Sequence, residues 1–118
     1  MDDSHKLYEM ARNAATPEEA IALYQRSADI FPHFKTLELL GELLLKTGKP
    51  KEAIVPLAAA TTLNKQVRAP SLLAEALLMI GERQKARDVA RLALKRDQRN
   101  KKAIEIIGET EDLSAEDE

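Results

Sequence analysis

The sequence predicts an all-α protein built from a repeated pair of helices. Its apolar residues are mainly Leu, Ala and Ile, only 3% of the 118 residues are aromatic, and Trp is absent. Leu and Ala favour helices, whereas runs of Val, Thr and aromatic residues, which favour strands, are missing. The sequence also matches itself when it is shifted by 33 residues, and such a period is typical of helical-repeat proteins.

Small residues carry this repeat. Ala20, Ala53 and Ala86 are each 33 residues apart, and Gly48 and Gly81 have the same offset. Each of the two glycines follows a helical pattern and precedes a turn, which is the usual place for a glycine after a helix. Three units in register therefore predict a stack of helix pairs.

Each unit is predicted to contain two helices. Apolar residues recur at helical spacing, for example at Leu37, Leu40 and Leu44. We expect the first helices over 4–13, 36–46 and 70–80, the second helices over 17–31, 50–63 and 84–97, and a last helix over 101–112.

Local signals support several of these boundaries. Thr16 offers an N-cap, and Pro17 and Glu19 follow it at the positions of a first helical residue and a capping-box acid. Pro32 should end the second helix of the first unit, because a residue before proline avoids the helical conformation. Pro56 lies inside a predicted helix and is expected to kink it, because proline removes a backbone hydrogen bond.

At this level of detail the sequence resembles the tetratricopeptide-repeat family. That resemblance implies an all-α, right-handed superhelix of about three repeats and a capping helix. The family's early Trp is absent throughout, and its late Pro is present only as Pro32. The residues that carry the resemblance are Leu7, Ala20, Tyr24 and Pro32 in unit one, Leu40, Gly41, Leu44, Gly48, Ala53, Leu57 and Ala60 in unit two, and Leu73, Ala74, Leu77, Gly81, Ala86 and Ala93 in unit three.

We predict one domain and a short acidic tail. The segment from Glu109 to Glu118 holds six acidic residues and no basic one, so the rest of the chain has 14 acids against 18 bases and a net charge of +4. The domain covers residues 1–112, with repeats over 1–33, 34–66 and 67–100 and a capping helix over 101–112, and the tail covers 113–118.

The resemblance also implies where a partner would bind. A helix pair cannot bury its apolar face alone, so the units stack and leave a concave groove lined by the first helix of each repeat. The groove residues that the resemblance implies are Asp2, His5, Glu9, Arg12, Lys35, Glu38, Leu39, Glu42, Leu45, Lys46, Arg68, Ser71, Leu72, Glu75, Leu78, Met79, Lys102, Glu105, Ile106 and Glu109.

Acidic residues in matching register give this groove its predicted chemistry. Glu9, Glu42, Glu75 and Glu109 occupy one position of successive first helices, beside apolar residues such as Leu39. One interpretation is a groove for an extended or helical peptide with basic and apolar side chains. The other is that the acids pair locally, as Glu42 does if it meets Lys46 at a spacing of four.

One known binding mode of the family is excluded. The co-chaperones that grip an acidic carboxyl terminus use Lys, Asn and Arg residues at positions that correspond here to His5, Glu9, Leu39, Arg68 and Leu72. Only Arg68 fits that pattern, and Glu9 would repel a carboxylate. We therefore do not expect this clamp.

A basic stripe is the second candidate surface. We give this name to Arg83, Arg87, Arg91, Lys95 and Arg99, which are spaced four apart. It could contact an anionic partner, could be a solvated face, or could receive the acidic tail of the same chain. No aromatic residues are interleaved with it for base stacking, so we do not expect nucleic acid, and we do not expect a membrane because the apolar side of this helix is needed for the core.

Catalysis, cofactors and metal binding are not expected. The chain has no Cys, no glycine-rich phosphate loop and only His5 and His33, so it lacks the groups for nucleophilic or thiolate chemistry, and we predict no small-molecule substrate. No apolar run approaches the roughly 18 residues of a membrane span. The first residues are acidic, where a secretory signal would be basic, so we expect a cytoplasmic protein.

Three functions follow from these features. The first is an adaptor or chaperone-like module that holds a segment of another protein in the groove. The second is self-assembly, for which Leu7, Tyr8 and Met10 leave the N-terminal helix less well covered, so that a monomer and a weak homodimer both remain open. The third is binding of an anionic surface by the basic stripe.

Overall fold

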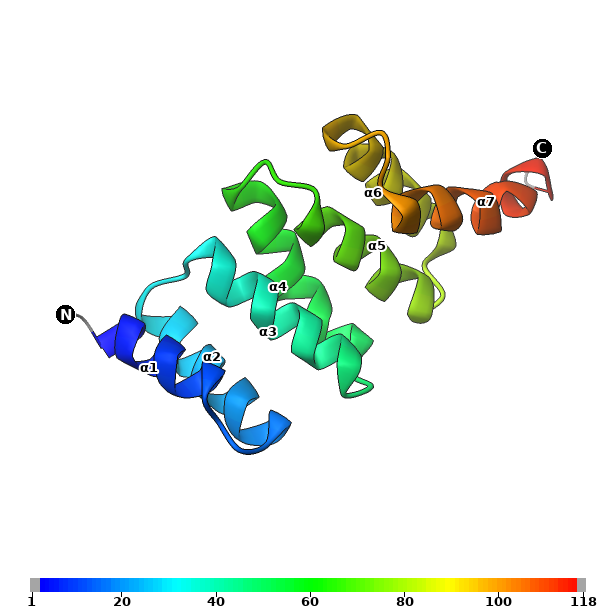
Figure 1. Cartoon of the computed structure of the whole chain (residues 1–118). Helices are drawn as coiled ribbons and strands as arrows, with labels where there is room; N and C mark the ends of the chain where they lie inside the picture. Colours follow the sequence, from blue (N-terminus) through cyan, green and yellow to red (C-terminus); the bar gives the residue numbers. More distant parts are fainter. Residues whose placement is uncertain (1–2, 117–118) are drawn as a thin grey trace.

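The computed structural model describes residues 3–116, and it describes side-chain surroundings for residues 3–111. Helices account for most of this part of the chain, and they form antiparallel pairs stacked side by side (Figure 1). Within residues 3–116 the helices are α1 (Asp3–Arg12), α2 (Pro17–Ile30), α3 (Phe34–Lys46), α4 (Pro50–Leu63), α5 (Arg68–Met79), α6 (Arg83–Arg96) and α7 (Lys101–Glu116).

The observed helices match the predicted ones closely. All six helices within residues 3–96 begin and end within two residues of the expected positions. The exception is α7, which continues to Glu116 and so takes in four residues assigned to the acidic tail. The last two residues of that tail, 117–118, lie outside the described residues.

The two glycines that mark the repeat close the same kind of turn. Gly48 and Gly81 have φ angles of 80° and 85°, the left-handed conformation that only glycine adopts without strain. After α3, the Lys49 amide donates to the Leu44 carbonyl at 2.8 Å and the Gly48 amide donates to the Leu45 carbonyl at 3.1 Å. The same pair of bonds recurs around Gly81, so both repeats end their first helix in one helix-capping motif.

The helix starts and ends follow the local signals in the sequence, with one addition. The Thr16 hydroxyl accepts a hydrogen bond from the Glu19 amide at 3.2 Å, which confirms the predicted N-cap. Phe31, before Pro32, is extended and ends α2 as expected. His33 is an N-cap that the sequence analysis missed, since its Nδ1 accepts from the Lys35 amide at 3.1 Å.

Prolines inside helices are accommodated. Pro56 is buried within α4, which runs unbroken from Pro50 to Leu63, so the hydrogen bond lost at Pro56 does not end the helix. Pro70 was expected to open α5, but the helix begins two residues earlier, at Arg68. The third residue of a helix has no intrahelical partner for its amide, so a proline costs little there.

The core lies between the helices and is built around small side chains. Ala53 and Ala86, two of the repeat-marking alanines, are fully buried, as is Ala74. Gly41 lies against Leu57 so closely that an added Cβ would be 2.3 Å from the Leu57 Cγ. Small residues in this register therefore let the helices approach closely.

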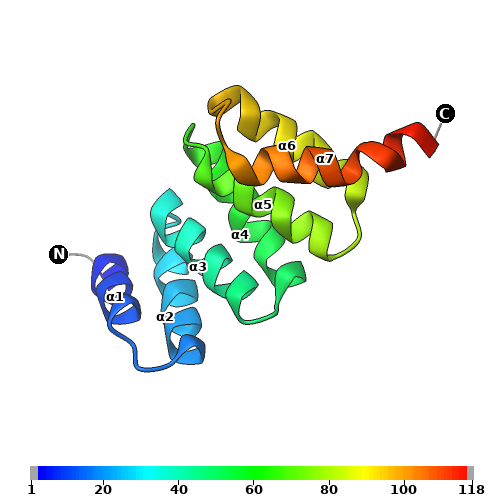
Figure 2. The same ribbon diagram turned by 45° about the vertical axis from the view of Figure 1, so that its right-hand side comes forward.

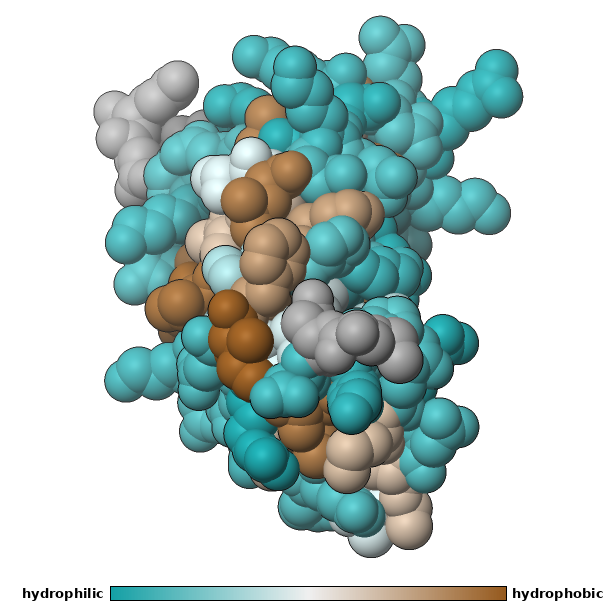
Figure 3. All heavy atoms as spheres, turned by 90° about the vertical axis from the view of Figure 1, so that its left-hand side faces the viewer, coloured by the Kyte–Doolittle hydropathy of each residue, from teal (hydrophilic) through white to brown (hydrophobic). Residues whose placement is uncertain are grey.

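The whole molecule is elongated, with principal extents of 53 × 26 × 20 Å. The N- and C-termini lie at opposite ends of the stack (Figures 1 and 2). Apolar side chains form a patch on the N-terminal end of the molecule (Figure 3). The first helix pair contributes Met10, Ile30 and the adjoining Phe31 as exposed apolar residues, at 54%, 53% and 57% exposure.

Candidate functional site

The first helices of the second and third repeats form one continuous surface with the capping helix. α3 packs against α5, and α5 packs against α7, so these helices form a row across the second and third repeats and the capping helix (Figure 2). α3 also packs against α4, α5 against α6, and α7 against α6. The row therefore presents one face away from α4 and α6.

A hollow of about 380 Å³ lies on this row of helices. It is open to solvent, and side chains from three helices border it. Every one of its lining residues belongs to the groove that the family resemblance implied. They are Glu42, Leu45 and Lys46 from α3, Leu72, Glu75 and Met79 from α5, and Lys102 from α7.

The floor and the rim of this hollow differ in chemistry. Leu45 and Leu72 are buried or half-buried and pack on the core, while Met79 is 53% exposed. At the rim, Lys102 forms an ion pair with Glu75 at 3.3 Å across the boundary between α5 and α7. The hollow thus joins apolar contact area to two carboxylates, Glu42 and Glu75, that already have cationic partners.

A second ion-pair cluster joins α3 to α5. The Glu38 carboxylate, whose side chain is 3% exposed, lies 3.2 Å from the Lys35 Nζ and 3.3 Å from the Arg68 Nε. Arg68 also pairs with Glu42. The local pairing proposed for Glu42 is therefore corrected: its partner is Arg68 of the next repeat and not Lys46, because the neighbouring helix brings a guanidinium closer.

Some of the predicted groove residues are buried and require correction. Ile106 is 4% exposed and belongs to the hydrophobic core, and Glu38 is 2% exposed beneath its two cations. A bound segment would not reach either side chain directly. They point inward because a capping helix must bury one face against α5 and α6, and because Glu38 sits where two cations converge on it.

Ser71 is also buried, at 6% exposure, and Leu45 is buried at 9% although it lines the hollow. Asp2 lies outside the described residues, and the other predicted groove residues are at least partly accessible. Leu39, Leu72 and Leu78 are half-buried and pack against the core, and Glu9 and Glu75 are half-buried as well. The exposed members are Arg12, Arg68, Met79, Glu105 and Glu109, and Lys35 is half-buried.

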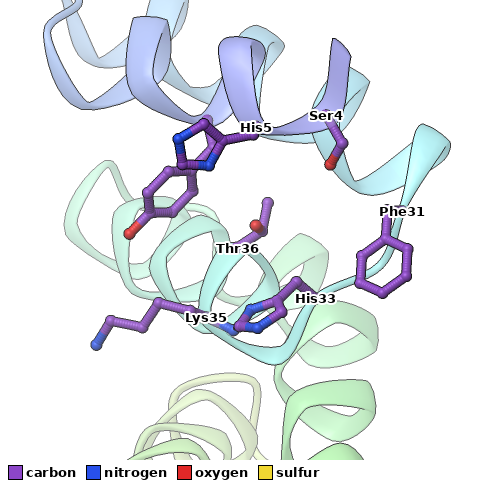
Figure 4. Close-up of a pocket in the computed structure, with 7 residues that line it drawn as sticks. Ser4, His5, Phe31, His33, Lys35 and Thr36 are labelled. Atoms are coloured by element: carbon purple, nitrogen blue, oxygen red, sulfur yellow. The ribbon is translucent and has the colours of Figure 1, made fainter. Parts of the chain in front are cut away.

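A second hollow, of about 330 Å³, lies between the first two repeats. Figure 4 shows His5 and Ser4 on α1 facing His33, Lys35 and Thr36 across it, with Phe31 at one side. Tyr8 also lines it, and the His5 and Tyr8 rings are stacked with centroids 6.4 Å apart. The walls of this hollow are therefore largely rings and hydroxyl groups.

The sequence analysis missed this ring-lined hollow. The signal was present, because the chain has two Phe, two Tyr and two His, and all six lie between residues 5 and 34. The Tyr8 ring also meets the Tyr24 ring edge-on at 6.0 Å, and the Arg12 guanidinium lies 5.9 Å from the Tyr8 centroid. The aromatic and imidazole rings of this chain are thus concentrated at its N-terminal end, and this uneven distribution is visible in the sequence.

The basic stripe lies on α6 and the turn after it. Arg91, Lys95 and Arg99 are exposed, and Arg87 is half-buried with a Nε that has no hydrogen-bond partner in the described part of the chain. Arg83 donates from Nη2 to the Glu109 carbonyl of α7 at 2.7 Å.

The described residues show neither a metal cluster nor a membrane-spanning helix. No group of three or more His, Cys, Asp or Glu side chains there is arranged to hold a metal ion. Among the helices of residues 3–116, none is both long and apolar enough to cross a membrane.

Fold and groove together define a helical-repeat protein of the α-α superhelix class. No family model matches the sequence, and no curated protein matches it at a significant level. Solved structures do match it. The crystal structure of MamA is 27% identical over 98% of this chain and 67% of that chain, with a TM-score of 0.81.

Named tetratricopeptide-repeat domains are equally similar in shape. The first such domain of Spaghetti (RPAP3), bound to the HSP90 peptide SRMEEVD, is 18% identical over 95% of this chain and 93% of that chain, with a TM-score of 0.84. The Yersinia enterocolitica type III secretion chaperone SycD, in complex with a peptide of the translocator YopD, is 21% identical over 100% and 98%, with a TM-score of 0.79. The chain therefore has the tetratricopeptide-repeat fold, as its 33-residue repeat led us to expect.

Proposed function

We propose that this protein is an adaptor that holds a peptide or helical segment of a partner protein in its concave groove. The observation that carries the proposal is the hollow on α3, α5 and α7, whose apolar floor includes Leu45, Leu72 and Met79. Clefts that combine apolar contact area with a few fixed polar groups are the usual form of a binding site.

Exposure of Met79 supports this location. An exposed large apolar side chain beside a hollow offers contact area that water solvates poorly, and methionine adapts its shape to different partners. The ion pair between Lys102 and Glu75 would hold the rim in place before a partner arrives. A rim ordered in advance lowers the entropic cost of binding.

The solved relatives support the same class of function. The RPAP3 domain and SycD are each seen with a peptide of another protein. At 18% and 21% identity these likenesses concern the fold, so the groove residues of this chain carry the rest of the argument.

The ion pairs narrow the chemistry that we expect of the bound segment. Glu38, Glu42 and Glu75 each have a cation beside them, so they attract a basic side chain less than a free row of acids would. Glu105 and Glu109 on α7 are exposed and have no ion pair among the described residues. We therefore expect a segment with an apolar anchor for the hollow and basic side chains toward α7.

A paired substitution tests the groove. Met79→Glu places a charge beside the hollow, whereas Val55→Glu places the same charge on α4, where Val55 is 76% exposed. Both replace an exposed apolar residue, so neither should unfold the protein, and circular dichroism checks this. We expect a partner captured from native lysate by the wild type to be lost with Met79→Glu and retained with Val55→Glu.

Two results would count against the groove. Retention of the partner by both variants would remove the hollow from the proposal, and loss with Val55→Glu alone would move the binding surface to the outer helices. A captured partner should also protect α3 and α5 amides from hydrogen exchange more than those of α4.

A second candidate function is self-association through the N-terminal end. Exposed Met10, Ile30 and Phe31 support it, together with the apolar patch visible from that end (Figure 3), whereas Leu7 is buried. Sedimentation over a hundredfold range of concentration tests it. Concentration-dependent mass that disappears with Met10→Glu and Ile30→Glu would favour it, and a constant monomer mass would exclude it.

A further inference from the structure

We propose that the basic stripe binds an acidic polypeptide segment on the convex side of the molecule, independently of the concave groove. The stripe consists of Arg83, Arg87, Arg91 and Lys95 on α6 and Arg99 in the following turn. Its charge, its lack of internal partners and its spacing each support this proposal.

The cations of the stripe lack acidic partners. Arg87, Arg91, Lys95 and Arg99 form no ion pair with any of the described residues, and Arg83 meets a backbone carbonyl only. The acids nearby are occupied with other groups. Asp88 accepts a hydrogen bond from the Gln84 side chain at 3.1 Å, and Asp97 accepts one from the Arg99 amide at 3.0 Å.

The contrast with the groove is informative. On the concave side Glu38, Glu42 and Glu75 are each matched by a cation from another position of the fold. The stripe has no such matching, although it belongs to the same small molecule. A row of like charges with no acid beside it favours an anionic partner that comes from outside the described residues.

The start of α6 is a second feature that favours an anion beside the stripe. Its first turn contains Arg83 and Lys85 and no acidic residue. The N-cap residue, Glu82, makes no capping hydrogen bond with its side chain and pairs with Lys85 at 3.9 Å instead. The start of a helix carries partial positive charge, so cations are unfavourable there and anions are favourable. A carboxylate contributed by a partner would relieve both effects.

The geometry of the stripe fits an extended chain. Residues four apart on a helix rise about 6 Å along the axis. Alternate side chains of an extended segment lie on one face and are about 6.6 Å apart. Each step of four residues also turns by about 40° around the axis. A segment with acidic residues at alternate positions can therefore place carboxylates near neighbouring cations of α6, such as Arg91 and Lys95.

An acidic polypeptide fits this face better than the two other anionic partners. All the rings of the chain lie between residues 5 and 34, so α6 offers no ring on which a nucleic-acid base could stack. The apolar side chains Val89 and Leu94 of α6 are half-buried and pack against the core, so neither stands out to enter a bilayer. The planar guanidinium group of arginine can donate two parallel hydrogen bonds to one carboxylate.

Fluorescence anisotropy with a defined peptide tests the proposal. The probe is a labelled ten-residue peptide of alternating Glu and Ser, and its Gln–Ser counterpart is the uncharged control. The stripe variant is Arg91→Gln, Lys95→Gln and Arg99→Gln, and the matched control is Arg26→Gln, Lys51→Gln and Lys65→Gln. All six positions are exposed, so both variants should fold, and both lose three positive charges.

We expect the Glu–Ser peptide alone to bind the wild type, and the stripe variant to weaken that binding about tenfold, as three modest ion pairs would. The control variant should change it less than twofold, and Arg91→Lys with Arg99→Lys should retain most of it. Equal weakening by both triple variants would show a general charge effect and overturn the proposal. The proposal would also be overturned if the stripe bound a ten-nucleotide oligothymidine more tightly than the peptide. The same holds for vesicles that contain phosphatidylserine.

Discussion

Gly41 shows how a single residue sets the distance between two helices. It lies in α3 opposite Leu57 of α4, and the missing side chain leaves room for the leucine. The equivalent position in the third repeat is Ala74, which is fully buried without a comparable clash. The same register thus tolerates one methyl group in one repeat and none in the other, because the facing side chains differ.

Replacing Gly41 by alanine should therefore destabilise the protein. The added Cβ would lie 2.3 Å from the Leu57 Cγ, so the leucine or the helix must move, at a cost of about 1–3 kcal/mol. Urea unfolding measures this as a lower midpoint. Gly108 is the matched control, because its Cβ would meet open space, and Gly108→Ala should stabilise α7 by about 0.5–1 kcal/mol. Equal midpoints for Gly41→Ala and the wild type would contradict the close packing.

Tyr24 is expected to make the stability of the protein depend on pH in the alkaline range. Burial raises the pKa of its phenol above 10.0, and the neighbouring Tyr8 adds to the effect. The folded state therefore holds the phenolic proton more tightly than the unfolded state. The stability that this supplies is complete below pH 10 and is lost as pH rises through the folded pKa.

The variant Tyr24→Phe isolates this contribution. It should lose less stability than the wild type between pH 9 and pH 11, because it has no phenol at this position to ionise. Thermal unfolding across that range measures the difference between the two proteins. Parallel stability curves would show that Tyr24 ionises equally well in the folded and unfolded states, contrary to its burial.

At the scale of helices, the junction between α4 and α6 depends on one arginine. Arg96 donates from Nη1 to the carbonyls of Asn64 and Gln66, both at 3.0 Å, and from Nη2 to the Thr61 carbonyl at 3.1 Å. These carbonyls lie at the end of α4 and just after it, where a helix leaves acceptors unpaired. Arg96 therefore acts as a C-terminal cap that comes from the next repeat.

Removal of this cap should cost more than removal of its neighbour. Arg96→Ala leaves partly buried carbonyls without donors, so we expect a loss of about 1–3 kcal/mol. Lys95→Ala, one position earlier on the exposed face, should change stability by less than about 0.5 kcal/mol. Chemical denaturation of the two variants compares them. A similar effect of both substitutions would show that the three hydrogen bonds contribute little.

At the scale of the whole molecule, the repeat determined what could be predicted. Helix limits followed from Gly48, Gly81 and the spacing of apolar residues, because these are local signals that a sequence displays. Glu38 was assigned to the surface because its partner Arg68 is distant in sequence, and a pattern within one helix does not reveal a neighbour that arrives from the next repeat. The ring-lined hollow was missed for the same reason, since its walls come from two repeats.

The same packing makes the two ends of the solenoid unequal. α1 and α2 are tied to each other by Ser4 and Ser27, whose hydroxyl groups each donate to the other residue's backbone carbonyl, at 3.1 and 2.7 Å. The first repeat joins the second mainly through α2 and α3, and this is the sparsest of the inter-repeat junctions because the ring-lined hollow separates α1 from α3.

In a repeat protein, stability is roughly a sum of unit and neighbour terms, so a thin junction allows one unit to open alone. We expect the amides of α1 and α2 to exchange with solvent through an opening of lower free energy than those of α4, α5 and α6. Native-state hydrogen exchange at increasing denaturant measures these free energies by segment. A single value for all helices would instead mean that the three repeats unfold together. If the first repeat does open alone, a ligand that fills the ring-lined hollow must raise the protection of α1 and α2 selectively, because it would bridge the junction that is otherwise thin.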